Sequence, residues 1–156
     1  LKMINFSFVI VLLATYTLCG VAAKPTILTG MVTHVRDGDT IEVGKIPIRL
    51  NGVSAPELHE LLGNESKQFM NNMIVGKHLT CELSGERTYD RYVGTCYMEE
   101  QDIGEILINN GLALDCPRYS NGRYAQFEKK KAQKNIELPT YCGKKKNIQN
   151  KTRKQN

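Results

Sequence analysis

This 156-residue sequence lacks several features, and each absence narrows the kinds of protein it can be. No Cys-x-x-Cys pair occurs, although zinc sites built from four cysteines normally show one. No internal repeat is present, and no apolar run beyond the first 23 residues is long enough to cross a bilayer. Neither Ser54 nor Ser120 has a base that the sequence places beside it, so nucleophilic catalysis through serine is unsupported.

The N-terminal segment lacks charge and is rich in apolar residues. The uncharged run extends from Ile4 to Val21 and ends in the small residues Val21-Ala22-Ala23. A short apolar run with such an ending is typical of a cleaved signal peptide rather than a membrane anchor. We therefore expect residues 1–23 to be removed by cleavage after Ala23, which would send the protein to the periplasm or the medium. An uncleaved anchor and a lipoprotein acylated at Cys19 are the alternatives.

Charge is divided unevenly over the rest of the chain. Residues 24–128 contain 10 Lys/Arg and 15 Asp/Glu, whereas residues 129–156 contain 10 Lys/Arg and a single acidic residue, Glu137. We expect one domain over residues 24–142 and a basic tail without regular structure over residues 143–156. Such a tail favours loose binding of a polyanion through counterion release, and a solvated tail that aids solubility is the alternative.

Four cysteines follow the leader, and an even number in an oxidising compartment predicts disulfides. Cys81 and Cys96 lie in two strand-like segments that can be neighbours in a hairpin. Cys116 and Cys142 would then tie the C-terminal segment to the body. This is the favoured one of the three pairings that four cysteines allow, and a four-cysteine zinc site is the alternative.

Apolar periodicity predicts five strands and about three helices. The expected strands cover residues 27–36, 40–43, 46–53, 78–83 and 91–98, with a hairpin loop at 84–90. The expected helices run from Asn64 or Ser66 to about Ile74, from the cap Asp102 through Ile108, and from about Arg123 to Asn135, with an irregular or extended segment at 112–119. This order predicts a mainly β fold with α-helices, a small closed or partly open five-stranded OB-type barrel.

Two carboxylates stand two residues apart in the turn Asp37-Gly38-Asp39. They can point at one position, as a site for a hard cation requires. Asp-Gly is also among the commonest hairpin turns, so this turn alone is a weak indication.

An arginine stands among apolar neighbours in the segment Ile48-Arg49-Leu50. A guanidinium without a partner is costly to bury, so Arg49 needs an anion, either a carboxylate or a phosphate. Glu57 follows Pro56, which fixes its direction. A structural ion pair between Arg49 and Glu57 is one interpretation, and a phosphate site is the other.

Two further arginines, Arg87 and Arg91, flank the expected hairpin loop. Two guanidinium groups neutralise a phosphate at more than one oxygen better than lysines do. Salt bridges to Glu86 and Asp90 on the surface of the turn are the alternative.

Together these segments resemble the staphylococcal nuclease (thermonuclease) family in order and spacing. The resemblance rests on the Asp-Gly-Asp-Thr turn at 37–40, the Arg-Leu-x-Gly-Val-x-Ala-Pro-Glu run at 49–57 and the Tyr-x-Arg loop at 89–91. It continues through Asp102-Ile103-Gly104-Glu105, Gly111-Leu112-Ala113 and Tyr119, and so covers roughly residues 27–132. The sequence is most similar to the exported bacterial branch, which carries Gly-Glu-Arg-Thr-Tyr-Asp-Arg before its fifth strand and Cys-Pro-Arg-Tyr after its second helix.

The resemblance implies an OB-type domain that hydrolyses phosphodiesters of DNA or RNA with calcium and with little sequence specificity. By position, it implies that Glu57 is the base that activates water. It implies that Arg49 and Arg91 hold the phosphate and stabilise charge in the transition state. Tyr119 would lie near the bound nucleotide, with Arg87 as a further contact to nucleic acid.

The same resemblance implies that Asp39 is the main carboxylate ligand of calcium, with the Ala55 carbonyl as a second ligand. Ser54 stands where the family often has an aspartate ligand. A serine oxygen is neutral, so we expect calcium to bind more weakly or to rely on Asp37 and water. Two other departures are Asp90 in place of a common glycine and Pro117 in place of a tyrosine.

The main rival to an enzyme is an OB-fold module that binds nucleic acid or protein without turnover, and Ser54 is the feature in its favour. The presence of Arg49, Glu57 and Arg91 together favours the enzyme. His59 invites a role as a base because it is close to Glu57 in sequence, but an exposed loop histidine explains it better. We expect a monomer with no stable membrane association once the leader is removed.

Overall fold

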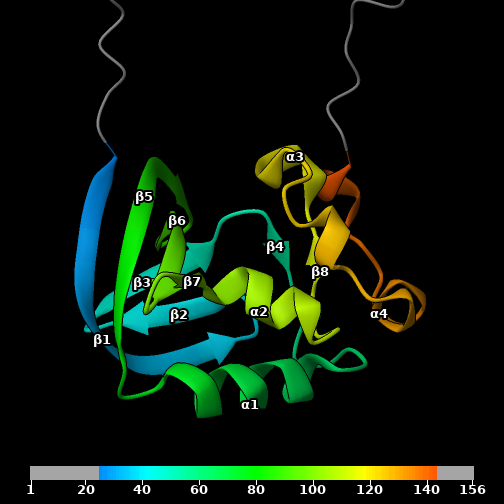
Figure 1. The fold of residues 1–156 in the computed structure, drawn as a ribbon, viewed down its shortest axis with the longest axis horizontal. Helices are drawn as coiled ribbons and strands as arrows, with labels where there is room; N and C mark the ends of the chain where they lie inside the picture. The colour runs from blue at the N-terminus through cyan, green and yellow to red at the C-terminus, as the bar shows by residue number, and fades with distance from the viewer. Residues whose placement is uncertain (1–24, 144–156) are drawn as a thin grey trace, which may run out of the picture.

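The computed structural model describes residues 25–143 (Figure 1), so the expected signal peptide and almost all of the expected basic tail lie outside the described residues. The strands are β1 Thr26–Asp37, β2 Thr40–Val43, β3 Ile46–Leu50, β4 Val53–Ser54, β5 His78–Thr88, β6 Arg91–Met98, β7 Gln101–Asp102 and β8 Leu114–Asp115. The α-helices are α1 Gly63–Ile74, α2 Ile103–Asn109, α3 Pro117–Ser120 and α4 Lys130–Asn135. Two 3-10 turns, η1 Ala125–Phe127 and η2 Thr140–Cys142, complete the set.

Five of the strands form a ring that closes on itself. β1 pairs antiparallel with β2 and with β5, β2 pairs antiparallel with β3, and β5 pairs antiparallel with β6. The ring is completed by a parallel pairing between β3 and β6. Each of the five strands therefore has a neighbour on both sides. The mainly β fold class with α-helices is confirmed, with four short α-helices where about three were expected.

The ring encloses an apolar core. Because side chains alternate between the two faces of a strand, every second strand residue points inward. α1 packs against β1 below the sheet, and α2 follows β7, contacts β6 and extends toward β4 and β8 (Figure 1). The fully buried side chains include Val35, Ile41, Ile48 and Leu79 from strands and Met70, Ile74, Ile103 and Leu107 from helices. The core therefore fills the inside of the strand ring.

The β5–β6 hairpin is longer than the sequence predicted. Residues 84–88 belong to β5, and only Tyr89 and Asp90 form the turn. Tyr89 has a positive φ of 56°, as tight two-residue turns require. The pairing resumes after an irregularity that contains Gly85, so that Arg87 lies opposite Tyr92. Arg87 on β5 and Arg91 on β6 consequently both lie on paired strands and not on a loop.

The predicted strand 46–53 is interrupted by the turn Asn51-Gly52, which separates β3 from β4. Gly52 has a φ of 75°, and a Cβ at this position would lie 2.8 Å from the Cα of Ser120. A turn this close to α3 needs glycine. β4 then pairs with β8 in a separate two-stranded sheet.

Two expectations for the C-terminal third were right only in part. The helix expected over 123–135 is divided into the 3-10 turn η1 and α4, because Glu128 between them has extended backbone angles and its carboxylate accepts the Asp115 amide at 2.8 Å. The segment 112–119, expected to be irregular or extended, is extended at β8 but also contains the first part of α3. The proline at the first position of α3 suits a helix start.

Both favoured disulfides are present. Cys81 and Cys96 lie directly opposite each other in β5 and β6, with 4.0 Å between their Cα atoms. Cys116 joins the start of α3 to Cys142 in η2, with a Cα–Cα distance of 4.6 Å. The alternative of a four-cysteine zinc site is therefore wrong, and the disulfides are compatible with an extracellular or periplasmic location. Across residues 25–143, every helix is too short or too polar to cross a membrane.

Candidate active site

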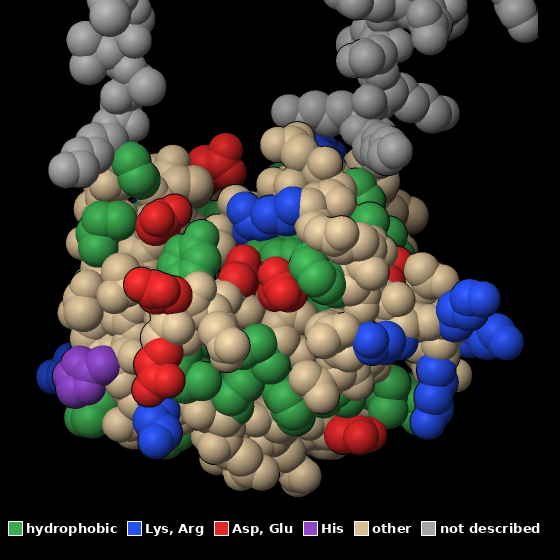
Figure 2. Space-filling view, viewed as in Figure 1, with side chains coloured by type: hydrophobic (Ala, Val, Ile, Leu, Met, Phe, Trp, Pro, Cys, Tyr) green, Lys and Arg blue, Asp and Glu red, His purple; other side chains and the backbone are tan. Residues whose placement is uncertain are grey.

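A cavity of about 540 Å³ opens at the upper end of the molecule. One wall is the β5–β6 hairpin, the floor is the end of β3 with the turn that follows, and the other wall is formed by α3 and η2. Figure 2 shows Lys/Arg side chains between these walls. Five of the predicted site residues line this one cavity: Arg49, Glu57, Arg87, Arg91 and Tyr119.

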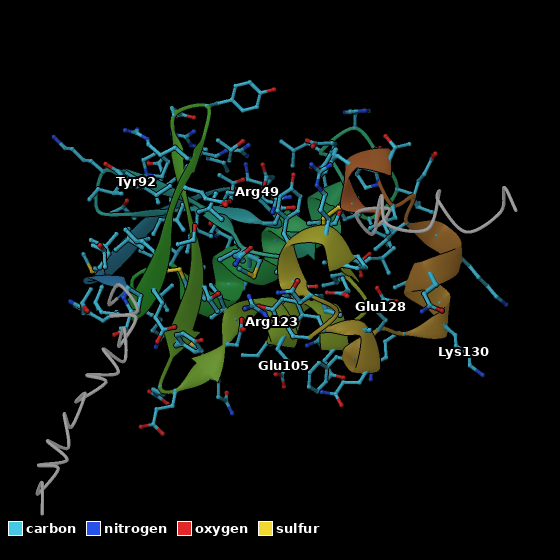
Figure 3. The ribbon with its side chains drawn as sticks, turned by 90° about the horizontal axis from the view of Figure 1, so that it is seen from above. Arg49, Tyr92, Glu105, Arg123, Glu128 and Lys130 are labelled. Carbon is cyan, nitrogen blue, oxygen red and sulfur yellow. A yellow bond between two sulfur atoms is a disulfide. The ribbon has the colours of Figure 1, made fainter. Side chains whose placement is uncertain are left out.

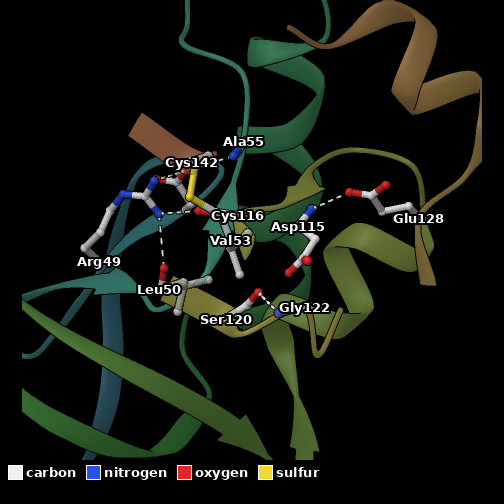
Figure 4. The surroundings of a disulfide bond; sticks show 11 residues. Arg49, Leu50, Val53, Ala55, Asp115, Cys116, Ser120, Gly122, Glu128 and Cys142 are labelled. Carbon is white, nitrogen blue, oxygen red and sulfur yellow. Dashed lines mark hydrogen bonds and ion pairs between the residues drawn. A yellow bond between two sulfur atoms is a disulfide. The ribbon is translucent and has the colours of Figure 1, made fainter. Parts of the chain in front are cut away.

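Arg49 is held at the floor of the cavity by three hydrogen-bond acceptors (Figure 4). One Nη atom donates to the carbonyl oxygens of Leu50 at 3.1 Å and Val53 at 2.7 Å. The other Nη atom lies 2.9 Å from a carboxylate oxygen of Asp39. The anion that the buried arginine needed is thus Asp39, and the alternative of a structural Arg49–Glu57 ion pair is wrong. Seen from above, Arg49 lies between the hairpin and the C-terminal segments (Figure 3).

Strand register explains this ion pair. β2 and β3 pair so that Arg49 faces Thr40, the residue next to Asp39. On the other side of β3, Arg49 faces Val93 of β6, two residues beyond Arg91. The closure of the strand ring therefore brings segments far apart in the sequence to one place.

Asp39 is almost completely buried, with 6% of its surface exposed. The carboxylate oxygen that contacts Arg49 also accepts the backbone amide of Ala55 at 2.8 Å. Burial raises the pKa of Asp39 to about 7, although Arg49 acts in the opposite direction. The positive charge of Arg49 consequently offsets only part of the cost of burying the negative charge of Asp39.

Asp37, the second carboxylate of the turn, is half-buried and accepts the backbone amide of Asp39 at 3.0 Å. This contact fixes the turn in the manner of an Asx turn. Ser54 is buried and follows Val53 in β4. Among the residues that the structure describes, no three His, Cys, Asp or Glu side chains gather into a metal-holding cluster. The three residues predicted to hold a metal, Asp37, Asp39 and Ala55, nevertheless meet at one turn.

Arg91 reaches from β6 to β2, where its Nη1 donates to the Thr40 hydroxyl at 2.9 Å. Its guanidinium also lies 5.9 Å from the ring of Tyr89 at the hairpin tip. Thr40 is almost fully buried, so this contact gives the long side chain a fixed anchor. No local sequence pattern links Arg91 with Thr40.

The salt bridges predicted within the hairpin take a different form. Asp90 pairs with Arg36 of β1 at 2.8 Å, and this hydrogen bond lowers the pKa of Asp90. Arg87 lies over the ring of Tyr92 at 4.4 Å and donates to the Asp90 carbonyl at 3.4 Å. Arg36, and not Arg87 or Arg91, is thus the side-chain partner of Asp90.

Glu57 enters the cavity from the loop between β4 and α1. Its side chain is exposed, but its backbone is fixed: the amide donates to Glu60 at 2.8 Å. A Cβ at Gly63 would lie only 1.9 Å from the Glu57 carbonyl oxygen, so the loop packs directly on the start of α1. This packing fixes the backbone of a residue that lines the same cavity as Arg49 and Arg91.

Tyr119 projects from α3 and is 43% exposed. A second tyrosine of the same wall, Tyr141, lines the cavity as well and is 48% exposed. Sequence analysis missed Tyr141. The only signal was its place next to Cys142, which has no meaning for the cavity until the partner of that cysteine is known.

Comparison with known proteins gives a family match and several relatives. Residues 47–137 match the family described as staphylococcal nuclease homologue. The succinoglycan biosynthesis protein ExoI of Rhizobium meliloti (strain 1021) is 33% identical over 119 residues, which are 69% of this chain and 61% of that protein. An uncharacterized endonuclease of Haemophilus influenzae is 27% identical over 70% of this chain and 65% of its own length.

A plant relative, the staphylococcal-like nuclease CAN1 of Arabidopsis thaliana, is 27% identical over 79% of this chain and 38% of its own length. The matched part of this chain therefore spans less than two thirds of the length of each of these three relatives. The family match includes Arg49, Glu57, Arg91 and Tyr119, and it ends before Tyr141.

Proposed function

Since the chain belongs to the staphylococcal nuclease family, we propose that it is a phosphodiesterase that hydrolyses DNA or RNA. The observation that carries this proposal is the convergence of Arg49, Glu57 and Arg91 on one cavity. They come from β3, from the loop before α1 and from β6. Relatives named as endonucleases and staphylococcal-like nucleases support the same reaction.

The two arginines are the phosphate-binding groups of this proposal. Arg49 is oriented by the carbonyls of Leu50 and Val53, and Arg91 is oriented by Thr40. A guanidinium held in advance at the position where negative charge develops stabilises the transition state without reorganising. Two such groups, one on β3 and one on the neighbouring strand β6, can neutralise two oxygens of one phosphate.

Glu57 is the general base of this proposal. Its carboxylate can accept a proton from the water that attacks the phosphorus, provided that the water lies within hydrogen-bond reach. Its backbone is fixed by the Glu60 carboxylate and by close packing on Gly63, and Glu57 lines the cavity, which supports this role. The water and the phosphate then meet between Glu57 and the arginines.

Calcium is the metal that the family implies, and the donor set fits a weak site for it. Asp39 is a buried carboxylate that one guanidinium compensates only in part, as its raised pKa of about 7 indicates. Asp39, the Ala55 carbonyl and Asp37 would hold the ion, with water in the remaining positions. A calcium ion bound there would add positive charge beside the phosphate. Ser54 in place of an aspartate makes us expect weaker binding than a site with two strong carboxylates gives.

The compartment and the substrate breadth belong to the same proposal. Two disulfides support an oxidising compartment such as the periplasm or the medium, and a cleaved leader at residues 1–23 remains our prediction. Contacts confined to phosphate and to one stacked base are tolerant of sequence, so we expect little sequence specificity.

The second candidate is an OB-fold module that binds nucleic acid or protein without turnover. Ser54 favours it, and so does the small number of acidic side chains around Asp39 in the part of the chain that the structure describes. Such a module would keep the arginines as a phosphate-binding surface and would show no turnover at any calcium concentration.

Hydrolysis assays separate the two candidates. Single-stranded DNA, duplex DNA and RNA are incubated with the purified protein while calcium is titrated against a chelator. We expect calcium-dependent cleavage that Glu57→Gln lowers by orders of magnitude and that Glu65→Gln, a control on the exposed side of α1, leaves unchanged. Strand binding without cleavage at every calcium concentration would identify the binding module instead.

A further inference from the structure

Tyr141 stands on the wall of the cavity although it lies outside the matched family region. η2, which contains it, runs beside α3 at the upper right of the molecule (Figure 1). Tyr119 comes from α3 and Tyr141 from η2, and both line the cavity that contains Arg49 and Arg91. The wall opposite the hairpin therefore presents two phenol rings to the space above two guanidinium groups.

One disulfide anchors both rings. Cys142, the residue after Tyr141, is bonded to Cys116, and both cysteines are buried. On the other side of the bond, the Tyr119 amide donates to the Cys116 carbonyl at 2.9 Å. The Cys142 amide donates to Pro139 at 2.9 Å and closes the 3-10 turn around Tyr141. The two tyrosines are thus positioned relative to each other by the Cys116–Cys142 bond.

The segment that contains Tyr141 has one apolar anchor before the disulfide in the part of the chain that the structure describes. The last residue before it in a hydrophobic cluster is Ile136, which packs with Leu114 and Ala132. Leu138, between Ile136 and Cys142, is 36% exposed. The Cys116–Cys142 bond therefore helps to fix the path of this segment along the cavity.

The chemistry of the cavity matches one nucleotide unit of an unpaired strand. Guanidinium groups at the floor suit its phosphate, and exposed phenol rings on the wall suit the π face of its base. Tyr119 at 43% and Tyr141 at 48% exposure have ring surface available for such stacking. A base inside a duplex has both faces covered by its neighbours, so this arrangement selects unpaired or unstacked nucleotides.

We propose that Tyr141 binds the base of the nucleotide whose phosphate lies at Arg49 and Arg91, and that Tyr141 and Tyr119 together form a stacking site for one unpaired nucleobase. This inference rests on the proposed nuclease function and names the substrate class of the same site. Tyr141 is a substrate-binding residue here and takes no part in proton transfer.

Binding measured without turnover tests this inference separately from catalysis. Two fluorescein-labelled single strands are compared by anisotropy in the presence of a chelator, which prevents metal-dependent cleavage. One strand is oligothymidylate, and the other has the same length and phosphodiester backbone but carries tetrahydrofuran residues without bases. We expect Tyr141→Ala to weaken binding of the oligothymidylate about 5- to 150-fold, the range that loss of one stacked base gives. Binding of the baseless strand should stay within twofold.

Two control variants sharpen the comparison. Tyr141→Phe keeps the aromatic face and should bind the oligothymidylate as the unmodified protein does. Leu138→Ala alters the same segment away from the cavity and should change neither affinity. Equal affinities of Tyr141→Ala and the unmodified protein for oligothymidylate would overturn the inference. Equal losses on both strands would overturn it too, because Tyr141 would then support the backbone or the fold. An unmodified protein that binds both strands equally well, or neither, would contradict the stacking site itself.

The role of the disulfide is tested by a double-mutant cycle. Replacing Cys116 and Cys142 by serine should weaken oligothymidylate binding almost as much as Tyr141→Ala does. Adding Tyr141→Ala to the serine background should then cost less than threefold more. Full additivity would show that the disulfide does not position Tyr141. A protein that stacks thymidine through Tyr141 yet cleaves no strand with calcium would refute the nuclease proposal and leave this binding site in place.

Discussion

Arg49 and Asp39 form an ion pair, with 2.9 Å between nitrogen and oxygen, at the floor of the candidate active site. The sequence suggested other partners for both, Glu57 or a phosphate for the arginine and a metal ion for the carboxylate. Their contact shows that the two expected binding sites share a boundary. A ligand at either site therefore changes the electrostatics of the other.

The Arg49–Asp39 ion pair should stabilise the fold only when both side chains are present. We expect Arg49→Met to lower the free energy of unfolding by about 3 kcal/mol, because it leaves a buried carboxylate without its cation. The double variant Arg49→Met with Asp39→Asn should regain part of that loss. Urea denaturation of the three variants measures this, and losses that simply add would show that the two side chains do not interact.

Thr40 should matter for turnover although it takes no part in the chemistry. Thr40→Val keeps the shape of the side chain but removes the hydroxyl that anchors Arg91 at 2.9 Å. We expect kcat to fall roughly 10-fold with little change in KM, because the arginine is then less well oriented for the transition state. Steady-state cleavage of single-stranded DNA tests this, with thermal unfolding as the check on the fold. A change confined to KM would mean that Arg91 acts in substrate binding only.

Tyr124 should be a stabilising residue. Its hydroxyl donates to Asp102, the cap of α2, at 2.6 Å and accepts from Arg123 at 2.8 Å, and the residue is 2% exposed. Tyr124→Phe removes one hydrogen bond from the half-buried Asp102 and one from the exposed Arg123, and it should cost about 1–3 kcal/mol. The exposed Tyr141→Phe is the matched control and should cost less than about 0.5 kcal/mol. Calorimetry of both variants measures this. Equal losses of stability in the two variants would contradict the prediction.

Asp115 should give the stability an unusual pH dependence. The residue is 1% exposed, and burial raises its pKa although Ser120 acts in the opposite direction. A carboxyl with a raised pKa in the folded state binds its proton more tightly when folded, so it costs stability at neutral pH. That cost disappears as the pH falls below the ordinary range of aspartate. Asp115→Asn should therefore be more stable than the unmodified protein at pH 7, with the difference closing toward pH 4. Thermal unfolding between these pH values measures it, and a constant difference would contradict the assignment to Asp115.

The two disulfides should stabilise the protein by similar amounts but differ in their effect on strand binding. Their sequence separations of 15 and 26 residues predict losses of about 3 and 3.5 kcal/mol when each is replaced by alanines. Loss of Cys81–Cys96, which lies inside the ring, should leave strand binding unchanged. Loss of Cys116–Cys142 should weaken binding of strands that carry bases. A binding loss from Cys81→Ala with Cys96→Ala would show that the ring itself loosens.

Local sequence patterns predicted what depends on local order. Alternation predicted β2 at its observed ends, and the Asp102 cap predicted the start of α2. These patterns gave the wrong secondary structure where a contact distant in sequence determines the backbone conformation. Residues 84–88 resemble a loop because of Gly85, but pairing with β6 draws them into a strand. The helix expected from Arg123 is interrupted at Glu128, whose side chain binds the Asp115 amide.

In the candidate site, too, local motifs identified some residues, and others depend on contacts between distant segments. The motifs found Arg49, Glu57 and Arg91 because each stands in a distinctive local sequence, and the structure brings all three to one cavity. The ion pair between Arg49 and Asp39 depends on strand register, which no local pattern contains. Tyr141 was missed because its position depends on which cysteine pairs with Cys142.

The parallel pairing of β3 with β6 has a consequence for how the candidate active site assembles. Arg49 and Arg91 lie on opposite sides of this seam, one on each strand. A folding intermediate could complete every antiparallel hairpin, each of which links segments near in sequence, and still leave the seam open. Such an intermediate would have nearly all of its secondary structure and no assembled catalytic centre. Recovery of cleavage during refolding would therefore report on the closure of one seam, whereas circular dichroism would report on the hairpins that precede it.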